Sequence, residues 1–482
     1  MADPALVWFR DDYRISDNPA LTAAAATGAP ILCFFIFDES SQGIRPLGEA
    51  SGWWLHGSLS ALDSDLRALG SKLFLFRGSA SEIVSRIAAV THASSIFWNR
   101  RYEAAEIALD TGIKKDLVER GITVQTFNGK LLHEPWEIKN QAGKPFQVFT
   151  PYLRAVSMRS VAPPLPAPRT ITAGRWPADL LDSSVALDDL ALEPSRPNWA
   201  KGFAAEWNPG EQSARRKLAD FLNTELPGYA RQRDFPGKDS TSRLSPHLRF
   251  GETSPRQIWH ASTVRNDGQE SDTAKFLSEV VWRDFCYQQL FHNPNLATAP
   301  FNSRFGRFRW AADKDALAAW QKGRTGYPIV DAGMRQLWQA GWMHNRVRMI
   351  VGSFLVKHLL TDWRQGEAWF WDTLLDADPA NNAFNWQWVA GSGPDAAPFY
   401  RIFNPIAQGE KFDPNGAYIR AYVPELAGLP GSAIHRPWEA SKEILGPAGI
   451  ELGSTYPRPI VNHEQARERA LHAFRMLRAE AE

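Results

Sequence analysis

The chain has 482 residues, a formal net charge of +1, and 44% hydrophobic and 22% charged residues, the balance of an ordinary globular protein of two to three domains. Without an overall basic excess, any surface that binds nucleic acid must be a local patch. The two cysteines, Cys33 and Cys286, provide neither a disulfide framework nor a four-cysteine metal site, so no metal is predicted. The N-terminus lacks the pattern of a secretory signal, and no apolar run is long enough for a membrane span.

The first 130 residues alternate short apolar runs with helical patterns. Glycines at 28, 70 and 121 stand where helices should end, and Asp17 or Asn18 lies near the cap of the first helix. Strands alternating with crossover helices predict a parallel, doubly wound five-stranded α/β domain. No G-x-G-x-x-G follows the first strand, which argues against a nicotinamide site. The predicted strands are 6–10, 30–37, 72–78, 94–99 and 122–127, and the helices 19–28, 48–70, 81–92 and 103–121.

Beyond residue 130 the pattern changes. Proline-rich stretches predict an interdomain linker over 131–210, and helical patterns dominate afterwards. We therefore expect an α/β domain over 1–130 and an all-α domain over 211–482. The predicted helices of this second domain are 211–226, 254–262, 271–291, 314–323, 330–341, 344–360 and 463–480.

Three polar segments of the helical region could bind a ligand. Residues 237–251, GKDSTSRLSPHLRFG, combine hydroxyls with a helix start at Ser245, an arrangement that suits phosphate but is also common in plain helix starts. In SEVVWRDF, helical spacing places Glu279, Trp282 and Arg283 on one face, where they could hold a base-like ligand or simply include a surface ion pair.

The third segment, HNRVRM, places Asn345, Arg348 and Met349 on one helical face. An asparagine can satisfy both donors and acceptors of a heterocycle. An acid of the loop DADPANNAFNWQW, Asp376 or Asp378, could pair with Arg348, although acidic loops are usually solvated turns.

Five strings occur in order: YARQRDFPGKDSTSRLSPHLRFG, SEVVWRDF, GYPIVDAGMRQLWQAGWMHNRVRM, DWRQGEAWFWDTLLDADPANNAFNWQW and PFYRIFNPIAQGEKFD. Together they closely resemble the flavin domain of the DNA photolyase and cryptochrome family, and WFRDDYRISDNPAL resembles its N-terminal strand and turn. The resemblance covers almost the whole chain and is strongest to bacterial cyclobutane pyrimidine dimer photolyases of class I/III type. It implies light-driven repair, in which photoexcited reduced FAD transfers an electron to a flipped-out dimer.

The resemblance also implies residue roles. FAD would be bound by Tyr229, Thr241, Ser242, Arg243, Leu244, Ser245, Glu279, Trp282, Arg283, Asn345, Arg348, Asp376, Asp378 and Asn382. The dimer would meet Glu279, Trp282, Asn345, Met349 and Trp388, and electrons would reach the flavin through Trp310, Trp363 and Trp386. A buried Glu279 would favour the protonated acid that can hydrogen-bond the dimer. Expected DNA contacts are Trp282, Arg346, Arg401, Gln408 and Lys411, with Arg231 and Arg233 as further candidates.

The family commonly binds a second, antenna chromophore on the α/β domain. By resemblance we expect 5,10-methenyltetrahydrofolate, with a deazaflavin as the alternative. Residues after the strand ends could line its site or be ordinary loop residues: Phe37, Asp38, Asn99, Arg100 and Glu103.

Two other functions compete with repair. A cryptochrome-type photoreceptor would bind flavin and repair nothing, but Asn382, Glu279 and Trp282 favour repair. A flavin oxidoreductase would need a nicotinamide site. HNRVRM lacks the paired histidines expected of a (6-4) photolyase, so the cyclobutane dimer is the expected substrate. We expect a monomer in the bacterial cytoplasm that binds damaged DNA and no membrane.

Overall fold

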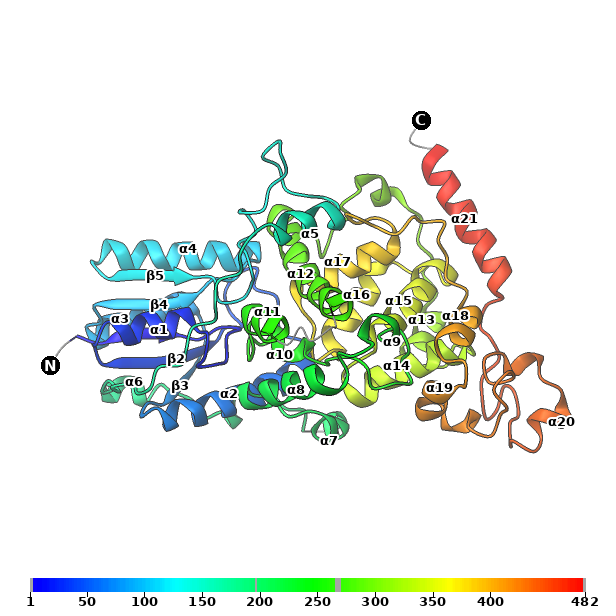
Figure 1. Cartoon of the computed structure of the whole chain (residues 1–482), viewed down its shortest axis with the longest axis horizontal. Coiled ribbons are helices and arrows are strands. Elements are labelled where there is room, and N and C mark those ends of the chain that lie inside the picture. Colours follow the sequence, from blue (N-terminus) through cyan, green and yellow to red (C-terminus); the bar gives the residue numbers. More distant parts are fainter. Residues whose placement is uncertain (1–2, 196, 265–269, 480–482) are drawn as a thin grey trace. The chain divides into compact units, whose positions relative to one another are not determined.

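The computed structural model describes residues 3–195, 197–264 and 270–479. The chain forms two compact units (Figure 1). Unit 1 comprises Met1–Pro227 and Ser242–Pro294, and unit 2 comprises Gly228–Thr241 and Asn295–Glu482. The domain boundaries expected at residues 130 and 210 stay a prediction. Among the described helices, none combines the length and the apolar character that crossing a bilayer requires.

Unit 1 contains the predicted five-stranded parallel sheet, with strand order β3-β2-β1-β4-β5. All five strands lie within one or two residues of their predicted positions. From β1 the chain proceeds to β2 and β3 on one side of the sheet, and then to β4 and β5 on the other side. The strand order therefore reverses between β1 and β4. Sheets of this kind bind ligands at such a point, at the carboxyl ends of the strands. The strands are β1 (Ala5–Trp8), β2 (Ile31–Phe37), β3 (Leu73–Arg77), β4 (Ser95–Asn99) and β5 (Thr123–Phe127).

Four helices connect these strands. One sheet face carries Trp8, Phe34 and Trp98 and is covered by apolar residues of α3 and α4. The right-handed crossover rule assigns α1 and α2 to the opposite face. Asn18 caps the first helix as expected, because its Oδ1 accepts from Leu21 N at 3.1 Å. The helices are α1 (Pro19–Ala26), α2 (Glu49–Ala68), α3 (Ala80–Thr91) and α4 (Ala104–Glu119).

The segment after the sheet carries little regular structure, yet part of it packs on the sheet. Trp176 packs against Phe74 with ring centroids 4.5 Å apart and planes tilted by 36°, and Ala173 forms a parallel bridge with Ile31. The elements of this segment are α5 (Phe149–Ser157), α6 (Ala178–Leu181), η1 (Asp188–Leu190), η2 (Trp199–Gly202) and α7 (Phe203–Glu206).

Four further helices complete unit 1, and the longest of them is anchored to the loop that follows β5. On it, Arg283 Nη1 donates to Lys130 O at 2.8 Å, and Asp284 Oδ2 accepts from His133 N at 3.0 Å. Burial raises the pKa of Asp284 to about 7. These contacts fix the rotation of the helix that carries Glu279 and Trp282. The four helices are α8 (Glu211–Thr224), α10 (Ser245–Arg249), α11 (Pro255–Val264) and α12 (Glu270–His292).

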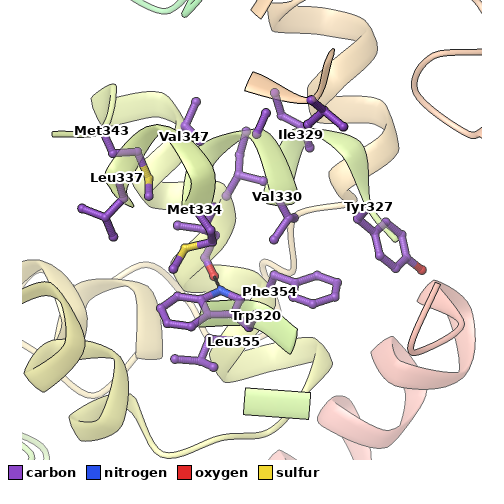
Figure 2. Packing of buried hydrophobic residues seen from close by; sticks show 14 of the residues in the cluster. Trp320, Tyr327, Ile329, Val330, Met334, Leu337, Met343, Val347, Phe354 and Leu355 are labelled. Atoms are coloured by element: carbon purple, nitrogen blue, oxygen red, sulfur yellow. Dashed lines mark hydrogen bonds between the residues drawn. The ribbon is translucent and has the colours of Figure 1, made fainter. Parts of the chain in front are cut away.

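The regular elements in the described part of unit 2 are helices, apart from isolated bridges, and its core is rich in aromatic residues. Figure 2 shows Trp320, Met334, Phe354 and Leu355 gathered in this core, and Trp320 Nε1 donates to Val351 O at 3.0 Å. Its elements are α9 (Tyr229–Gln232), η3 (Ser303–Arg307), α13 (Lys314–Gln321), α14 (Pro328–Ala340), α15 (Asn345–Ser353), η4 (Phe354–His358), α16 (Trp363–Thr373), α17 (Pro379–Ala390), α18 (Pro405–Phe412), α19 (Ala417–Tyr422), η5 (Pro424–Leu426), η6 (Pro437–Glu439), α20 (Lys442–Leu445) and α21 (His463–Ala479).

One predicted helix is wrong in its detail. The sequence predicted a single helix over 344–360, but α15 ends at Ser353 and continues as the π-helical turn η4. Two polar side chains of this turn form hydrogen bonds with other helices. Lys357 Nζ donates to Ala390 O at 3.0 Å, and His358 Nε2 lies 2.8 Å from His463 Nδ1. The wider turn is therefore accompanied by contacts to α17 and α21 that periodicity alone does not reveal.

Helices α16 and α17 approach closely at Gly366. A Cβ atom on Gly366 would overlap the indole ring of Trp386 and would lie 2.7 Å from Leu355 Cδ2. Trp386 is 3% exposed, so its ring has no room to move aside. The absence of a side chain at position 366 is thus a condition for the position of Trp386.

We predict that Gly366→Ala lowers the free energy of unfolding by about 1–3 kcal/mol, the usual cost of overpacking a core. Gly112→Ala is the matched control, because Gly112 lies within α4 and a Cβ there meets nothing within 4 Å. The control should gain up to about 1 kcal/mol from helix propensity. Urea unfolding measures both variants, and equal stability of the two would contradict the steric argument.

Candidate functional site

A pocket of about 100 Å³ lies in unit 2 where α15 and α17 begin. Seven side chains that the sequence singled out line it together: Asn345, Arg348, Met349, Asp376, Asn382, Trp386 and Trp388. The other lining residues are Gly352, Phe370, Leu374, Ala377, Asn381, Asn385 and Val389. The fold therefore gathers residues from two separate sequence motifs at one place.

His344 fixes the start of α15. Its Nδ1 accepts from Arg346 N at 3.2 Å, which caps the helix, and burial lowers the pKa of His344 to about 4. The ring is therefore neutral at pH 7 and can accept this bond. Because the cap defines the first turn, it positions Asn345, Arg348 and Met349. Sequence reasoning missed this residue, although a histidine directly before a helix start is a recognisable signal.

Arg348 forms the expected ion pair with Asp376. Its Nη2 lies 2.8 Å from Asp376 Oδ2, and its Nε donates to Met343 O at 2.7 Å. The Asp376 side chain is only 3% exposed, and within the described part of the chain its Oδ1 accepts no hydrogen bond. A buried carboxylate oxygen without a donor is rare in folded proteins, so a ligand N–H or O–H at the pocket would satisfy it.

Asp378 and Asn382 have different roles at α17. Asp378 caps the helix by accepting from Ala380 N at 3.0 Å and Asn381 N at 2.9 Å. Asn382 lines the pocket, and its Nδ2 donates to Glu367 O at 3.0 Å and to Glu367 Oε1 at 2.9 Å. Both amide hydrogens are thus engaged, which leaves Asn382 Oδ1 as the hydrogen-bond acceptor at the pocket wall.

Glu367, which holds this amide, was missed by sequence reasoning. It is 3% exposed on α16, and it is an acid amid the aromatic residues of WRQGEAWFW. An acid inside so apolar a helical pattern is the signal that could have indicated it.

The three tryptophans expected to carry electrons are all in unit 2. Trp386 and Trp363 are 3% and 1% exposed, and Trp310 is half-buried against Phe308, with ring centroids 4.3 Å apart. Trp386 also meets Trp320 edge to face, with centroids at 6.2 Å. Their roles in electron transfer stay predictions.

Unit 1 holds the expected substrate-facing side of α12. Trp282 stacks on Phe149, with centroids 3.6 Å apart and planes at 9°. Glu279 forms an ion pair with Lys275 at 2.8 Å, and 29% of its side chain is exposed. The role expected for Glu279 at the dimer stays a prediction.

The expected phosphate-binding residues are divided between the units. Tyr229, which begins α9, and Thr241 belong to unit 2, whereas residues 242–245 belong to unit 1. The predicted helix start at Ser245 is confirmed, and Leu244 stands at its cap without a side-chain hydrogen bond. Arg243 has a positive φ of 48° and lies over Trp207 at 4.5 Å, paired with Glu206. Ser242 is half-buried.

The expected antenna residues lie at or directly after the carboxyl ends of β2 and β4. Asp38 caps the adjacent turn by accepting from Ser41 N at 2.9 Å, and Asn99, 2% exposed, donates to Asp12 Oδ2 at 2.6 Å. Arg100 pairs with Glu134, whereas Phe37 and Glu103 are partly exposed. Desolvation of the Glu103 carboxyl group by the protein around it, reinforced by Glu106, raises the pKa of Glu103 to about 8. The antenna site stays a prediction.

Most of the residues expected to contact DNA are on unit 2. Arg401, Lys411 and Arg231 are exposed, and Gln408 is half-buried on α18. Arg346 is held in an ion pair with Asp234 at 2.7 Å.

His344→Ala should cost about 1 kcal/mol of stability, the usual value of an N-cap. Because the folded pKa of about 4 lies below the ordinary 6.5, the unfolded chain takes up this proton first. The contribution of His344 is complete above about pH 6.5 and is lost as the pH falls toward 4. Urea unfolding at pH 7.5 and 5.0 should show a smaller pH dependence in the variant. His472→Ala, at an exposed position of α21, is the control and should leave that dependence unchanged.

Comparison with known proteins places these features in a family. Residues 5–169 match the family described as DNA photolyase, and residues 276–476 match the FAD binding domain of DNA photolyase. The chain is 52% identical to a deoxyribodipyrimidine photo-lyase of Agrobacterium fabrum, over 98% of this chain and 97% of that protein. It is 40% identical to Cryptochrome-1 of Arabidopsis thaliana, over 98% of this chain and 70% of that protein.

A solved structure agrees with this assignment. The crystal structure of a class III photolyase from Agrobacterium tumefaciens superimposes with a TM-score of 0.95 at 50% identity, covering 99% of this chain and 98% of that one. The sheet, the helical unit and the relatives all lead to one conclusion: this chain belongs to the DNA photolyase family.

Proposed function

We propose that this chain is a deoxyribodipyrimidine photo-lyase, which uses light to split cyclobutane pyrimidine dimers in DNA with FAD as its cofactor. The observation that carries the proposal is the pocket at the starts of α15 and α17, lined by seven side chains expected from the photolyase resemblance. The 52% identity to a photo-lyase over nearly the full length of both chains supports it. Repair is favoured over the cryptochrome-type alternative on the same grounds.

The pocket fits the edge of a flavin ring. When bound, FAD supplies the light-driven electron that opens the dimer, a step for which no side chain is a sufficient photoreductant. Asn382 offers its fixed amide oxygen as an acceptor, and Asp376 Oδ1 offers a second one. Asn345 adds an amide with both donor and acceptor atoms. A flavin edge carries both hydrogen-bond donors and acceptors, which the two oxygens and the Asn345 amide could bind.

The same pocket also carries residues for the lesion. Met349 and Trp388 give it an apolar and aromatic part, which suits a pyrimidine dimer flipped out of the duplex. Photolyases are a standard case of base flipping, and a damaged base that stacks poorly costs less to extrude. Splitting the cyclobutane ring is redox-neutral overall, so the reaction needs no nicotinamide cofactor.

The antenna is the less defined part of the proposal. We propose a folate, 5,10-methenyltetrahydrofolate, at the carboxyl edge of the sheet, with a deazaflavin as the alternative. Phe37, Arg100 and Glu103 are the partly exposed members of the expected set and would contact it. The absorption spectrum of the purified protein after release of its chromophores distinguishes the two compounds.

The decisive test is a light-dependent repair assay. Reduced protein is mixed with an oligonucleotide that carries one thymine cyclobutane dimer, and blue light is compared with darkness. Loss of the dimer only in the light supports the photo-lyase. Bound and photoreducible flavin without any repair would contradict it and would favour a photoreceptor.

Trp386→Phe should slow photoreduction of the flavin strongly, because phenylalanine is much harder to oxidise than tryptophan. Trp176→Phe is the control, since Trp176 packs in the sheet core of unit 1. The measurement is the rate at which blue light bleaches oxidised flavin in the presence of an external reductant. An unchanged rate in Trp386→Phe would show that another residue, such as Trp320 or Trp388, supplies the electron.

A further inference from the structure

An acidic side chain neutralises one of the arginines expected to contact DNA. Arg346 follows Asn345 on the first turn of α15, and its Nη2 lies 2.7 Å from Asp234 Oδ2. The two side chains are 17% and 34% exposed, so the pair sits at the surface and is accessible to a second anion. A carboxylate thus occupies a position from which a phosphate oxygen could also bind the guanidinium.

Arg346 has contacts other than the acid that hold it in position. Its guanidinium carbon lies 4.4 Å above the ring of Phe412, at the end of α18, and its backbone N–H is fixed by His344. A partly exposed ion pair contributes little to stability. The main effect of Asp234 is therefore electrostatic, because it cancels a positive charge that the ring and the helix already hold in place.

Exposed cations also lie on the two elements beside this pair. Arg231 is exposed on α9, and Lys411 is exposed on α18, with its Nζ 5.1 Å from the ring of Phe412. Exposed cations of this kind attract any DNA backbone, whatever its sequence or damage. Arg346 differs from them because its charge is already paired and because its helix carries the pocket residues Asn345 and Met349.

We propose that Asp234 acts as an internal substitute for a DNA phosphate and determines specificity for damage. It keeps Arg346 neutralised in the free protein and on undamaged DNA. When the dimer enters the pocket, the phosphate beside the extruded nucleotide comes within reach of α15 and takes the place of the carboxylate. The proposal rests on the photo-lyase function, and it makes Asp234 a positioning residue that acts through Arg346.

The salt dependence of DNA binding tests this idea, because it counts neutralised phosphates. Dissociation constants are measured in the dark at several salt concentrations, with a dimer-containing duplex and its undamaged counterpart. Asp234→Asn should bind undamaged DNA more tightly and with a steeper slope. One added phosphate contact contributes about 0.9 to the slope. The ratio of the affinity of Asp234→Asn to that of the parent should therefore grow about eightfold for each tenfold fall in salt concentration.

Two further variants close a double-mutant cycle. Arg346→Gln alone should leave undamaged binding near the parent value and flatten the slope for damaged DNA by about 0.9. Asp234→Asn combined with Arg346→Gln should return the undamaged slope to the parent value. Asp234→Glu keeps the negative charge, so its salt slopes for both DNAs should stay close to those of the parent.

Glu425→Gln is the matched control. Glu425 pairs with Arg335 at 2.8 Å with similar exposure, 26% and 20%, on η5 and α14. This change also removes one negative charge and releases one arginine, but at a different place, so the slope should not change. FAD absorbance of each variant verifies that the helical unit is intact.

The proposal is overturned if Asp234→Asn leaves the salt slope for undamaged DNA unchanged. It is also overturned if Glu425→Gln steepens that slope equally, because the effect would then come from net charge alone. A parent protein without any preference for damaged DNA would instead contradict the photo-lyase function itself. Failure of the proposed role of Asp234 and failure of the photo-lyase function therefore give different results.

Discussion

The ion pair between the partly exposed Arg348 and the buried Asp376 is the contact on which the pocket depends. It ties the first turn of α15 to the turn that precedes α17, and it lies next to two helix caps, His344 and Asp378. Removing Arg348 would leave the buried carboxylate of Asp376 without its cation, at a cost of up to about 3–5 kcal/mol. The second oxygen of Asp376 remains unsatisfied within the described residues, so the pair that supports the pocket also offers it an acceptor.

Around this pair, the hydrogen-bonding capacity of the pocket is set by groups that do not line it. Glu367 engages both amide hydrogens of Asn382 and thereby selects which end of the amide a ligand meets. His344 caps α15 and thereby sets the direction of its first turn, which carries Asn345 and Arg348. Photochemistry requires a cofactor held in one orientation, and these supporting contacts give the chain that rigidity.

Much of the architecture could be predicted from the sequence because it follows local rules. The five strands correspond to short apolar runs, the first helix begins at the cap residue Asn18, and α10 begins at Ser245 with a proline directly after it. The pocket residues of α15 and α17 followed from family resemblance. The π turn at η4, the Glu367–Asn382 contact and the Asp234–Arg346 pair depend on contacts between different elements. Such contacts, 15 residues apart in the second case and 112 in the third, are not revealed by one sequence without relatives.

The close approach of α16 to α17 has a consequence for how the family can vary. Position 366 admits no side chain while position 386 carries an indole ring, and that ring both lines the pocket and packs against Phe370 and Trp320. The two positions can therefore change only together: a relative that replaces the glycine must also give up the tryptophan or separate the two helices. Among relatives that retain this ring, we expect the glycine to be inherited with it, so that a residue without a side chain records the presence of its aromatic neighbour.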